Sequence, residues 1–403
     1  MRPLSNRLVP FPLGPLFLLV AIFFLNFTSR IILAPLLPII MRDLSLSYGG
    51  AGSLFFLIQV GYSVGLLVSG VLSARLTHRH TILLSTTAVG GVLLVVALST
   101  SAPALRLELI CLGVVAGFYL PSSIATVTGF VDQAHWAKAI AIHELAPNLG
   151  FIAAPFLAEG LLQAVAWRSV LGILGGLALA MGGLFAWKGQ GGRHAGEAPR
   201  LSTLRLLLAD PSVWTASLLF SVAIGSGVGL YTMMPLYLVT EVGLDRELAN
   251  MVTGFSRVPG IALIFLAGAF ADRIGYRRSL AIYLTATGTL TVLLGAVQGH
   301  VLTPILLLLQ SAASVCFFPV AYSLLSTMFP LAQRGLAVSL VTIVGGLFGS
   351  GVLPSALGYI AEVASFGVGI ALVGLLTLAT ALLLRSPRPR ESNRQGADIA
   401  RIL

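Results

Sequence analysis

Two arginines stand in the middle of long apolar runs, where an ionised side chain is costly. Arg30 lies in the run 14–40 and Arg257 in the run 247–271, with no acidic residue close to either in the sequence. At 1.5 Å per residue, each is about 16 Å from one end of its run, roughly half of a 30 Å bilayer core. Because a guanidinium offers a planar fork of donors and keeps its proton, we expect both arginines to bind an anion. The alternative is an internal brace to Glu144 or to backbone carbonyls.

His143 and Glu144, in the run 138–160, have the chemistry to carry a proton. Imidazole exchanges protons near physiological pH, and removal from water favours the neutral form of a carboxyl. We therefore predict that Glu144 and His143 form a proton-coupling site. The alternatives are a salt bridge from Glu144 to an arginine and a histidine that only fills the packing.

Amide and tyrosine side chains in the same apolar runs are candidates for contacts with the anion. Both side-chain types can donate hydrogen bonds to a carboxylate. The alternative for each tyrosine is a packed or interfacial aromatic ring. The candidates are Asn26, Gln59, Tyr62, Tyr119, Asn148, Tyr231 and Tyr322.

The composition excludes a soluble protein and favours a membrane protein. Hydrophobic residues make up 57% of the 403 positions, charged residues only 9%, and the mean hydropathy is +0.97. Soluble domains carry about 25% charged residues. The net charge of +10 does not indicate nucleic-acid binding, because the basic residues are scattered singly and form no basic motif. No phosphate-binding loop or metal-ligand motif occurs, so we expect no cofactor, no metal and no enzymatic activity.

Twelve apolar runs predict an all-α integral membrane protein with twelve transmembrane helices in two six-helix bundles. We expect an N-terminal bundle at 1–187, a cytoplasmic linker at 188–210, a C-terminal bundle at 211–384 and a disordered cytoplasmic tail at 385–403. The runs are 14–40, 49–74, 81–100, 105–130, 138–160, 167–187, 211–240, 247–271, 279–299, 302–327, 335–359 and 364–384.

The distribution of basic residues predicts the orientation of the chain in the membrane. Most of the 24 Lys and Arg residues fall in the two termini, the linker and alternate loops, whereas Arg42, Arg106, Arg168 and Arg246 fall on the opposite side. Since Lys and Arg collect in cytoplasmic loops, we place both termini in the cytoplasm of a bacterium and the protein in its inner membrane.

The two halves repeat one pattern at an offset of 198 residues. Gly70 and Gly268, Pro121 and Pro319, and Gln59 and Arg257 are each separated by this number. Duplicated halves of this kind are typical of secondary transporters.

The segment from Gly268 to Arg278 closely resembles the G-x-x-x-D-R-x-G-R-[RK] loop of the Major Facilitator Superfamily. Its matching residues are Gly268, Asp272, Arg273, Gly275 and Arg277. The first half carries a degraded copy, in which Gly70 and Arg75 remain, Ala74 replaces the acid and Thr77 replaces the second glycine. The resemblance implies two pseudo-symmetric bundles that transport solutes by alternating access, with these two loops as gating elements.

The combined features predict a secondary transporter of a small organic anion of the carboxylate type, coupled to protons. Arg30 before Pro35-Leu36-Leu37-Pro38 is similar to the anion:cation symporter branch of the superfamily. We expect the bilayer, protons and the anion as partners, and a monomer. Two alternatives remain: a proton-driven exporter of drugs or amphiphiles, and a membrane sensor that binds a ligand without transporting it.

Overall fold

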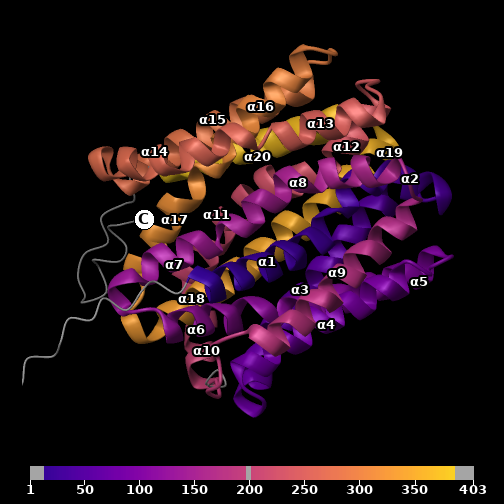
Figure 1. The fold of residues 1–403 in the computed structure, drawn as a ribbon. Coiled ribbons are helices and arrows are strands. Elements are labelled where there is room, and N and C mark those ends of the chain that lie inside the picture. Colours follow the sequence, from indigo (N-terminus) through magenta and orange to yellow (C-terminus); the bar gives the residue numbers. More distant parts are fainter. Residues whose placement is uncertain (1–12, 197–200, 386–403) are drawn as a thin grey trace, which may run out of the picture.

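The computed structural model describes residues 13–196 and 201–385, and every regular element in these ranges is a helix (Figure 1). Ten helices are long and apolar enough to cross a membrane. An eleventh span is the bent pair Arg246–Ile264 and Leu266–Ile274, at 45°, and a shorter apolar helix, Phe366–Leu382, follows the tenth. These segments correspond to the twelve predicted runs, so the prediction of an all-α, multi-pass membrane protein is confirmed.

The first six spans form the N-terminal half. Helix α4 packs along α9, and α3 packs along α5. The helices of this half are α1 (Leu13–Ile31), α2 (Leu33–Asp43), α3 (Tyr48–Arg75), α4 (His78–Val96), α5 (Ala102–Gly117), α6 (Tyr119–Phe130), α7 (Trp136–His143), α8 (Leu145–Leu162) and α9 (Trp167–Lys188), with a short 3₁₀ turn η1 (Gln133–His135).

The last six spans form the C-terminal half, in which α15 packs along α20. Two of its spans contain π-helical segments, in which backbone hydrogen bonds join residues five positions apart. The elements are α11 (Pro211–Ile224), η2 (Gly225–Gly229), α12 (Leu230–Thr240), α13 (Arg246–Phe255), α14 (Val258–Ile274), α15 (Tyr276–Ala296), α16 (Leu302–Val315), α17 (Phe317–Met328), α18 (Leu331–Gly346), η3 (Leu347–Val352), α19 (Leu353–Val363) and α20 (Phe366–Arg385).

Prolines explain where four spans break into two helices. Because proline has no N–H and its ring clashes with the preceding turn, the helix stops and restarts with proline in its first turn. One functional candidate, Glu144, is itself a break residue. The break residue and the proline three positions later are Ile32 and Pro35, Phe118 and Pro121, Glu144 and Pro147, and Cys316 and Pro319.

The hydrophobic core differs between the two ends of the molecule. At one end a single cluster joins both halves, with Leu36 and Phe55 from the first and Tyr237 and Phe366 from the second. Helices α2, α12, α13 and α19 gather at this end, on the right of Figure 1. Each half has its own separate cluster at the other end. The halves are therefore sealed together at one end only.

Polar contacts reinforce this seal between the halves. Glu159 of α8 forms an ion pair with Arg246 of α13 at 3.0 Å and accepts a hydrogen bond from Asn250 Nδ2. Asn250 Nδ2 also donates to the carbonyl of Pro35, at 3.2 Å. The amide of Gly49 donates to Glu362 Oε1, at 2.7 Å. The Arg246 and Glu159 side chains are 34% and 10% exposed, so this ion pair is part-buried and connects the two halves at the sealed end.

The linker is more ordered than the polar connection predicted for 188–210. It contains a helix, α10 (Leu201–Leu208), and its first part is bonded to the N-terminal half. The amides of His78 and Arg79 donate to the carbonyls of His194 and Gly192, at 3.3 and 2.7 Å. The linker therefore lies at the end of the molecule where the two halves have separate cores. Most of the predicted tail, from 386 onward, falls outside the described residues.

Candidate functional site

A cavity of about 490 Å³ lies between the two halves, and we call it the central cavity. Its wall is mostly apolar and includes several phenylalanines, with ionisable and amide groups set among them. The lining residues are Phe23, Phe27, Arg30, Ile31, Phe55, Ile58, Gln59, Tyr62, Leu66, Glu144, Pro147, Asn148, Phe151, Ile224, Val228, Thr232, Arg257, Ile264, Val315, Phe318, Pro319, Tyr322, Thr342, Gly346 and Ser350. The structure thus brings both arginines and Glu144 to one cavity, although three different spans carry them.

Arg30 is half-buried on α1 and is held loosely. Its guanidinium carbon lies 4.0 Å from the ring centroid of Tyr62 and 5.4 Å from that of Phe27. Its Nε donates a long hydrogen bond of 3.5 Å to the carbonyl of Asn26. Among the described residues, no acid forms an ion pair with Arg30. Since ring faces neutralise a cation only partly, Arg30 keeps donors for a ligand in the cavity.

Arg257 is 7% exposed and is held tightly at the break between α13 and α14. Its Nη2 donates to the carbonyl of Gly227, at 2.5 Å. The rings of Phe151 and Tyr231 each lie 4.7 Å from its guanidinium carbon. Its Nε is buried and has no hydrogen-bond partner, and none of the ion pairs in the described part of the chain includes Arg257. The expected backbone brace exists, yet it leaves the positive charge without a counter-ion.

The carbonyl that holds Arg257 belongs to the π-helical segment η2. Two glycines let η2 lie directly against η3, since a Cβ on Gly229 would be 2.2 Å from the carbonyl oxygen of Gly349. A π-helix departs from the regular i→i+4 ladder and is often found at functional sites. Arg257 is therefore connected through Gly227 to the contact between α11 and α18.

Glu144 and His143 form the acidic part of the site. The Glu144 side chain is 46% exposed toward the central cavity, and its Oε1 lies 3.4 Å from His143 Nδ1. His143 is fully buried behind the cavity, and its Nε2 lies 3.2 Å from the hydroxyl of Tyr119. No ion pair between Glu144 and an arginine occurs in the part of the chain that the structure describes.

Four predicted polar residues line the cavity, and three others stand behind it. Gln59, Tyr62, Asn148 and Tyr322 belong to the lining, and the hydroxyl of Ser350 donates to Gln59 Oε1 across the halves, at 3.3 Å. The three outside the lining are buried and bind backbone: Asn26 donates to the Ala116 carbonyl at 3.1 Å, Tyr119 to Leu19 at 2.7 Å, and Tyr231 to Phe151 at 2.6 Å. Only the first group therefore lies on the wall of the central cavity.

Sequence reasoning missed several residues of the site and of the sealed end. No sequence pattern singled out Phe27 and Phe151, whose rings contact the arginines, because phenylalanine occurs in most of the spans. Glu159 carried a usable indication, since it is an acid inside the run 138–160. Its partners Arg246 and Asn250 come from the other half, so no local pattern connects them.

The two predicted gating loops differ in structure as well as in sequence. Gly275 has φ of +89°, where glycine carries no steric cost, whereas Thr77 has φ of +150° at the corresponding place. Arg277 Nε donates to the carbonyl of Leu384, at 2.7 Å, and Asp272, Arg273 and Arg75 are exposed. Gly268 and Gly70 lie at intermediate depth near the ends of α14 and α3.

The linker braces the degraded loop of the first half. Arg79 donates to the carbonyls of Gly189 and Ala186, the latter at 2.8 Å. The amide of Gly196 donates to the carbonyl of Ser73, at 3.0 Å. These bonds surround the strained Thr77 from both sides, so the linker supplies support at the place where the first loop lacks the acid and the glycine.

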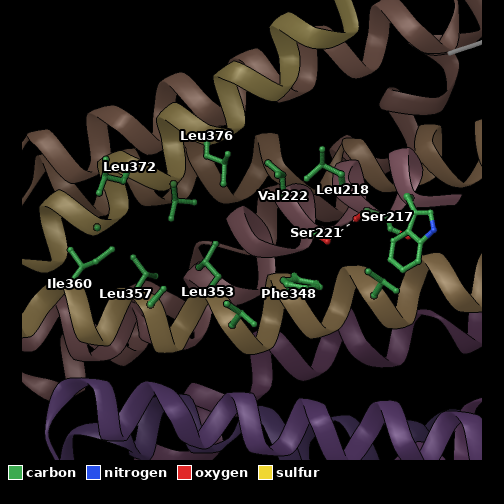
Figure 2. A pocket seen from close by; sticks show the side chains of 16 residues that line it. Ser217, Leu218, Ser221, Val222, Phe348, Leu353, Leu357, Ile360, Leu372 and Leu376 are labelled. Atoms are coloured by element: carbon green, nitrogen blue, oxygen red, sulfur yellow. Dashed lines mark hydrogen bonds between the residues drawn. The ribbon is translucent and has the colours of Figure 1, made fainter. Parts of the chain in front are cut away.

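A second hollow of about 530 Å³ lies on the outer face of the C-terminal half (Figure 2). It runs between α11, the α18–η3–α19 span and α20, and its labelled residues include Leu218, Phe348 and Leu372. Ser217 and Ser221 are among its few polar residues, and no ionisable side chain of the described residues lines it. This groove does not suit a charged solute, so the central cavity is the candidate site.

Comparisons with known proteins agree with the fold. The sequence model of the Major Facilitator Superfamily matches residues 19–260 and again 229–401. The class G tetracycline resistance protein of Vibrio anguillarum is 29% identical over 333 residues, which are 75% of this chain and 79% of that protein. The cis,cis-muconate transport protein of Acinetobacter baylyi is 23% identical over 282 residues, 64% of this chain and 62% of that protein.

A solved structure has the same fold over almost the whole chain. The bacterial homologue of the human lysosomal transporter Spinster, in an inward-facing and occupied conformation, superposes with a TM-score of 0.78. It shares 15% identity and covers 98% of both chains. The family match covers more than half of the chain, and the helices, the repeat and the loop from Gly268 to Arg278 agree with it. The chain therefore belongs to the Major Facilitator Superfamily and is a membrane transporter.

Proposed function

We propose that this protein is a secondary active transporter of a small organic anion of the carboxylate type, coupled to protons. The observation that carries the proposal is the pair of guanidinium groups in the central cavity that have no acidic partner among the described residues. An ionised group inside a membrane protein is costly unless a partner neutralises it. A carboxylate that enters the cavity supplies the missing charge, and its two oxygens suit the guanidinium fork.

The two arginines have different parts in the proposal. Arg30 binds the carboxylate directly, because it is less buried and its main contacts are the rings of Tyr62 and Phe27. Arg257 adds positive potential and transmits binding to η2 through Gly227. Gln59, Asn148 and Tyr322 supply hydrogen bonds to the rest of the solute. Asn26, Tyr119 and Tyr231 support the site from behind.

Glu144 and His143 supply the coupling to protons. Glu144 faces the same cavity as both arginines, so its charge and that of the anion compete for the same positive potential. Protonation of Glu144 removes the competing charge and leaves the arginines free for the solute. This linkage favours the binding of proton and anion together, which is symport.

Alternating access follows from the single seal between the halves. The contacts of Glu159 with Arg246 and Asn250 close one end, and the gating loops of both halves lie at the other end. We propose a bundle at 1–187, a linker at 188–210 and a second bundle at 211–384, with both termini in the cytoplasm. On this orientation the sealed end faces outward from a bacterial inner membrane, and the transporter acts as a monomer.

Uptake into liposomes under an imposed pH gradient tests the proposal. The purified protein is supplied with labelled succinate or gluconate, and with labelled succinamide as a neutral counterpart of succinate, and protein-free liposomes give the passive background. We expect at least one carboxylate to accumulate above that background when the outside is acidic, and succinamide not to accumulate. Accumulation of no carboxylate, or unchanged uptake after Arg30→Ala and Arg257→Ala, contradicts the proposal.

One observation favours a second candidate, a proton-driven exporter of drugs or amphiphiles. The class G tetracycline resistance protein is 29% identical, and much of the cavity wall is apolar. Large amphiphiles bind in apolar cavities that contain a few polar groups. Resistance of cells that overproduce the protein, lost on Glu144→Gln but retained on Arg30→Ala, supports this candidate over the anion symporter.

A further inference from the structure

His143 has one defined neighbour at each ring nitrogen. The ring is fully buried, and Phe23 of α1 stacks on it with ring centroids 4.6 Å apart. Its Nδ1 faces Glu144 Oε1 at 3.4 Å, and its Nε2 faces the Tyr119 hydroxyl at 3.2 Å. The protonation of each nitrogen is therefore set by what these two neighbours can donate or accept.

Tyr119 determines which nitrogen of His143 carries hydrogen. Its hydroxyl oxygen lies 2.7 Å from the carbonyl oxygen of Leu19. A carbonyl can only accept, so two oxygens at this distance need the hydroxyl proton between them. Because the hydroxyl has a single proton, it donates to Leu19 and can only accept from His143. Nε2 of His143 must therefore carry a hydrogen.

A hydrogen on Nε2 determines how Nδ1 of His143 interacts with Glu144. In a neutral imidazole with hydrogen on Nε2, Nδ1 presents a lone pair to Glu144. A carboxylate also presents lone pairs, so this contact is attractive only when a proton lies between Nδ1 and Oε1. A protonated carboxyl with a neutral ring satisfies the contact, and so does a carboxylate with an imidazolium. Both arrangements contain the same number of protons.

We propose that Tyr119 is a positioning residue that locks the tautomer of His143, so that His143 and Glu144 hold one exchangeable proton as a unit. The inference rests on the proposed proton coupling and specifies its site. Loss of the proton leaves a net negative pair at the cavity that Arg30 and Arg257 also line. The other titratable groups of that lining are Tyr62 of α3 and Tyr322 of α17, which remain neutral near pH 7. One proton is thus bound together with one anionic charge.

The tautomer can be measured directly by nitrogen NMR. The full-length protein, labelled with ¹⁵N-histidine, is placed in lipid nanodiscs, and the signal of His143 is assigned among the 6 histidines by its loss in His143→Gln. We expect Nε2 to be protonated at every pH at which the protein is folded. In Tyr119→Phe, which cannot accept from Nε2, we expect a fraction of the Nδ1–H tautomer to appear. A neutral wild-type ring with hydrogen on Nδ1 overturns the inference, whatever Tyr119→Phe shows.

The pH profile of uptake separates positioning from a merely structural role. In Tyr119→Phe the neutral ring can carry its hydrogen on Nδ1 and donate it to the Glu144 carboxylate, which makes loss of the shared proton easier. We therefore expect the upper pH limit of uptake to move to lower pH by about half to one unit. Tyr237→Phe is the matched control, because its hydroxyl also donates to a backbone carbonyl, that of Leu294 at 3.1 Å, and does not touch the pair. Equal profiles for the two variants overturn the inference.

The inference and the proposed function fail in different ways. If Glu144→Gln leaves gradient-driven uptake unchanged, proton coupling at this site is wrong whatever the tautomer of His143 is. If Glu144→Gln abolishes gradient-driven uptake while His143 carries hydrogen on Nδ1, the coupling stands and the lock by Tyr119 is wrong.

Discussion

The two halves of the molecule repeat the same arrangement of six spans but differ in which span carries the cavity arginine. At the offset of 198 residues, Arg30 corresponds to Val228, and Arg257 corresponds to Gln59. All four of these residues line the central cavity. Each half therefore contributes one guanidinium, from its first span in the N-terminal half and from its second span in the C-terminal half. The duplicated frame determines which positions face the cavity, and the chemistry at those positions has diverged.

The surroundings of the two arginines differ as much as their positions. Arg30 contacts Tyr62 through the ring and a side-chain hydrogen bond, and its bond to backbone is long, at 3.5 Å. Arg257 is bonded at 2.5 Å to Gly227 and lies between two rings. A loosely held guanidinium can turn toward a ligand, and a fixed one acts through its field and its attachments. We therefore propose that the N-terminal half binds the anion and that the C-terminal half transmits the binding.

The largest expected effect concerns Glu144, the acidic residue of the central cavity, which has no acidic equivalent in the described cavity wall of the C-terminal half. At the offset of 198, Glu144 corresponds to Thr342, another residue of the cavity. We expect Glu144→Gln to abolish accumulation driven by a pH gradient and to retain exchange of substrate at equal pH, since a neutral amide mimics the protonated carboxyl. Both fluxes are measured in liposomes. Glu247→Gln, which changes an exposed acid of the C-terminal half, should leave both unchanged.

Neutral replacements test whether both arginines contribute to binding. A charged hydrogen bond is worth about 1.5–3 kcal/mol, so we expect Arg30→Gln to weaken anion binding by roughly 10- to 100-fold. We expect Arg257→Gln to weaken it as well, because the cavity loses positive potential. Competition between labelled and unlabelled carboxylate gives the affinity. A loss confined to one arginine would refute a site formed by both halves.

Lysine replacements sharpen the distinction between a binding and a transmitting arginine. Arg30→Lys keeps a charge that can reach a ligand, and we expect it to retain uptake within about 10-fold of the wild type. Arg257→Lys loses the planar group that bonds Gly227 between two rings, so it should resemble Arg257→Gln. Equal behaviour of the two lysine variants in the uptake assay would show that the arginines have the same role.

The smallest expected effect compares the two gating loops. Gly275→Ala forces a side chain into φ of +89° and should lower stability by about 1–2 kcal/mol. Thr77→Gly removes strain at φ of +150° and should change stability by less than about 1 kcal/mol, since the unfolded chain also gains freedom. Thermal unfolding of both variants in detergent measures the difference. An equal loss in both would show that Thr77 is not strained.

The spans and the repeat were predictable because both are written into the sequence locally. A bilayer requires long apolar runs, and this requirement alone gives twelve spans and their approximate limits. Pro35, Pro121 and Pro319 lie just after breaks, since proline removes a bond from the helical ladder. Pro38, Pro155 and Pro235 stand inside continuous helices, so a proline alone does not predict a break. The depth of Arg30 and Arg257 in their runs was enough to suggest a shared cavity.

The contacts within the site were not predictable, because they depend on backbone geometry and on residues far apart in the chain. The carbonyl of Gly227 is available to Arg257 within a π-helical segment, and no residue pattern distinguishes such a segment from a glycine-rich α-helix. Tyr119 was expected in the cavity wall, yet the break at Phe118 turns it toward Leu19 and His143. The linker was expected to be only a polar connection. Its bonds to His78 and Arg79 were not predictable, because they are made by its backbone carbonyls and leave no side-chain pattern in the sequence.

The central claim is that Arg30 and Arg257, which have no acidic partner among the described residues, bind an anion. Measuring ligand binding to the purified protein tests this claim directly. Thermal unfolding is followed with benzoate and succinate and with their neutral amides, in the wild type and in the double variant Arg30→Gln/Arg257→Gln. A ligand that binds the folded state must raise its apparent stability. We predict that a carboxylate raises the unfolding temperature of the wild type only, and that the amides raise neither. A rise of equal size with the amides, or in the double variant, would contradict the account.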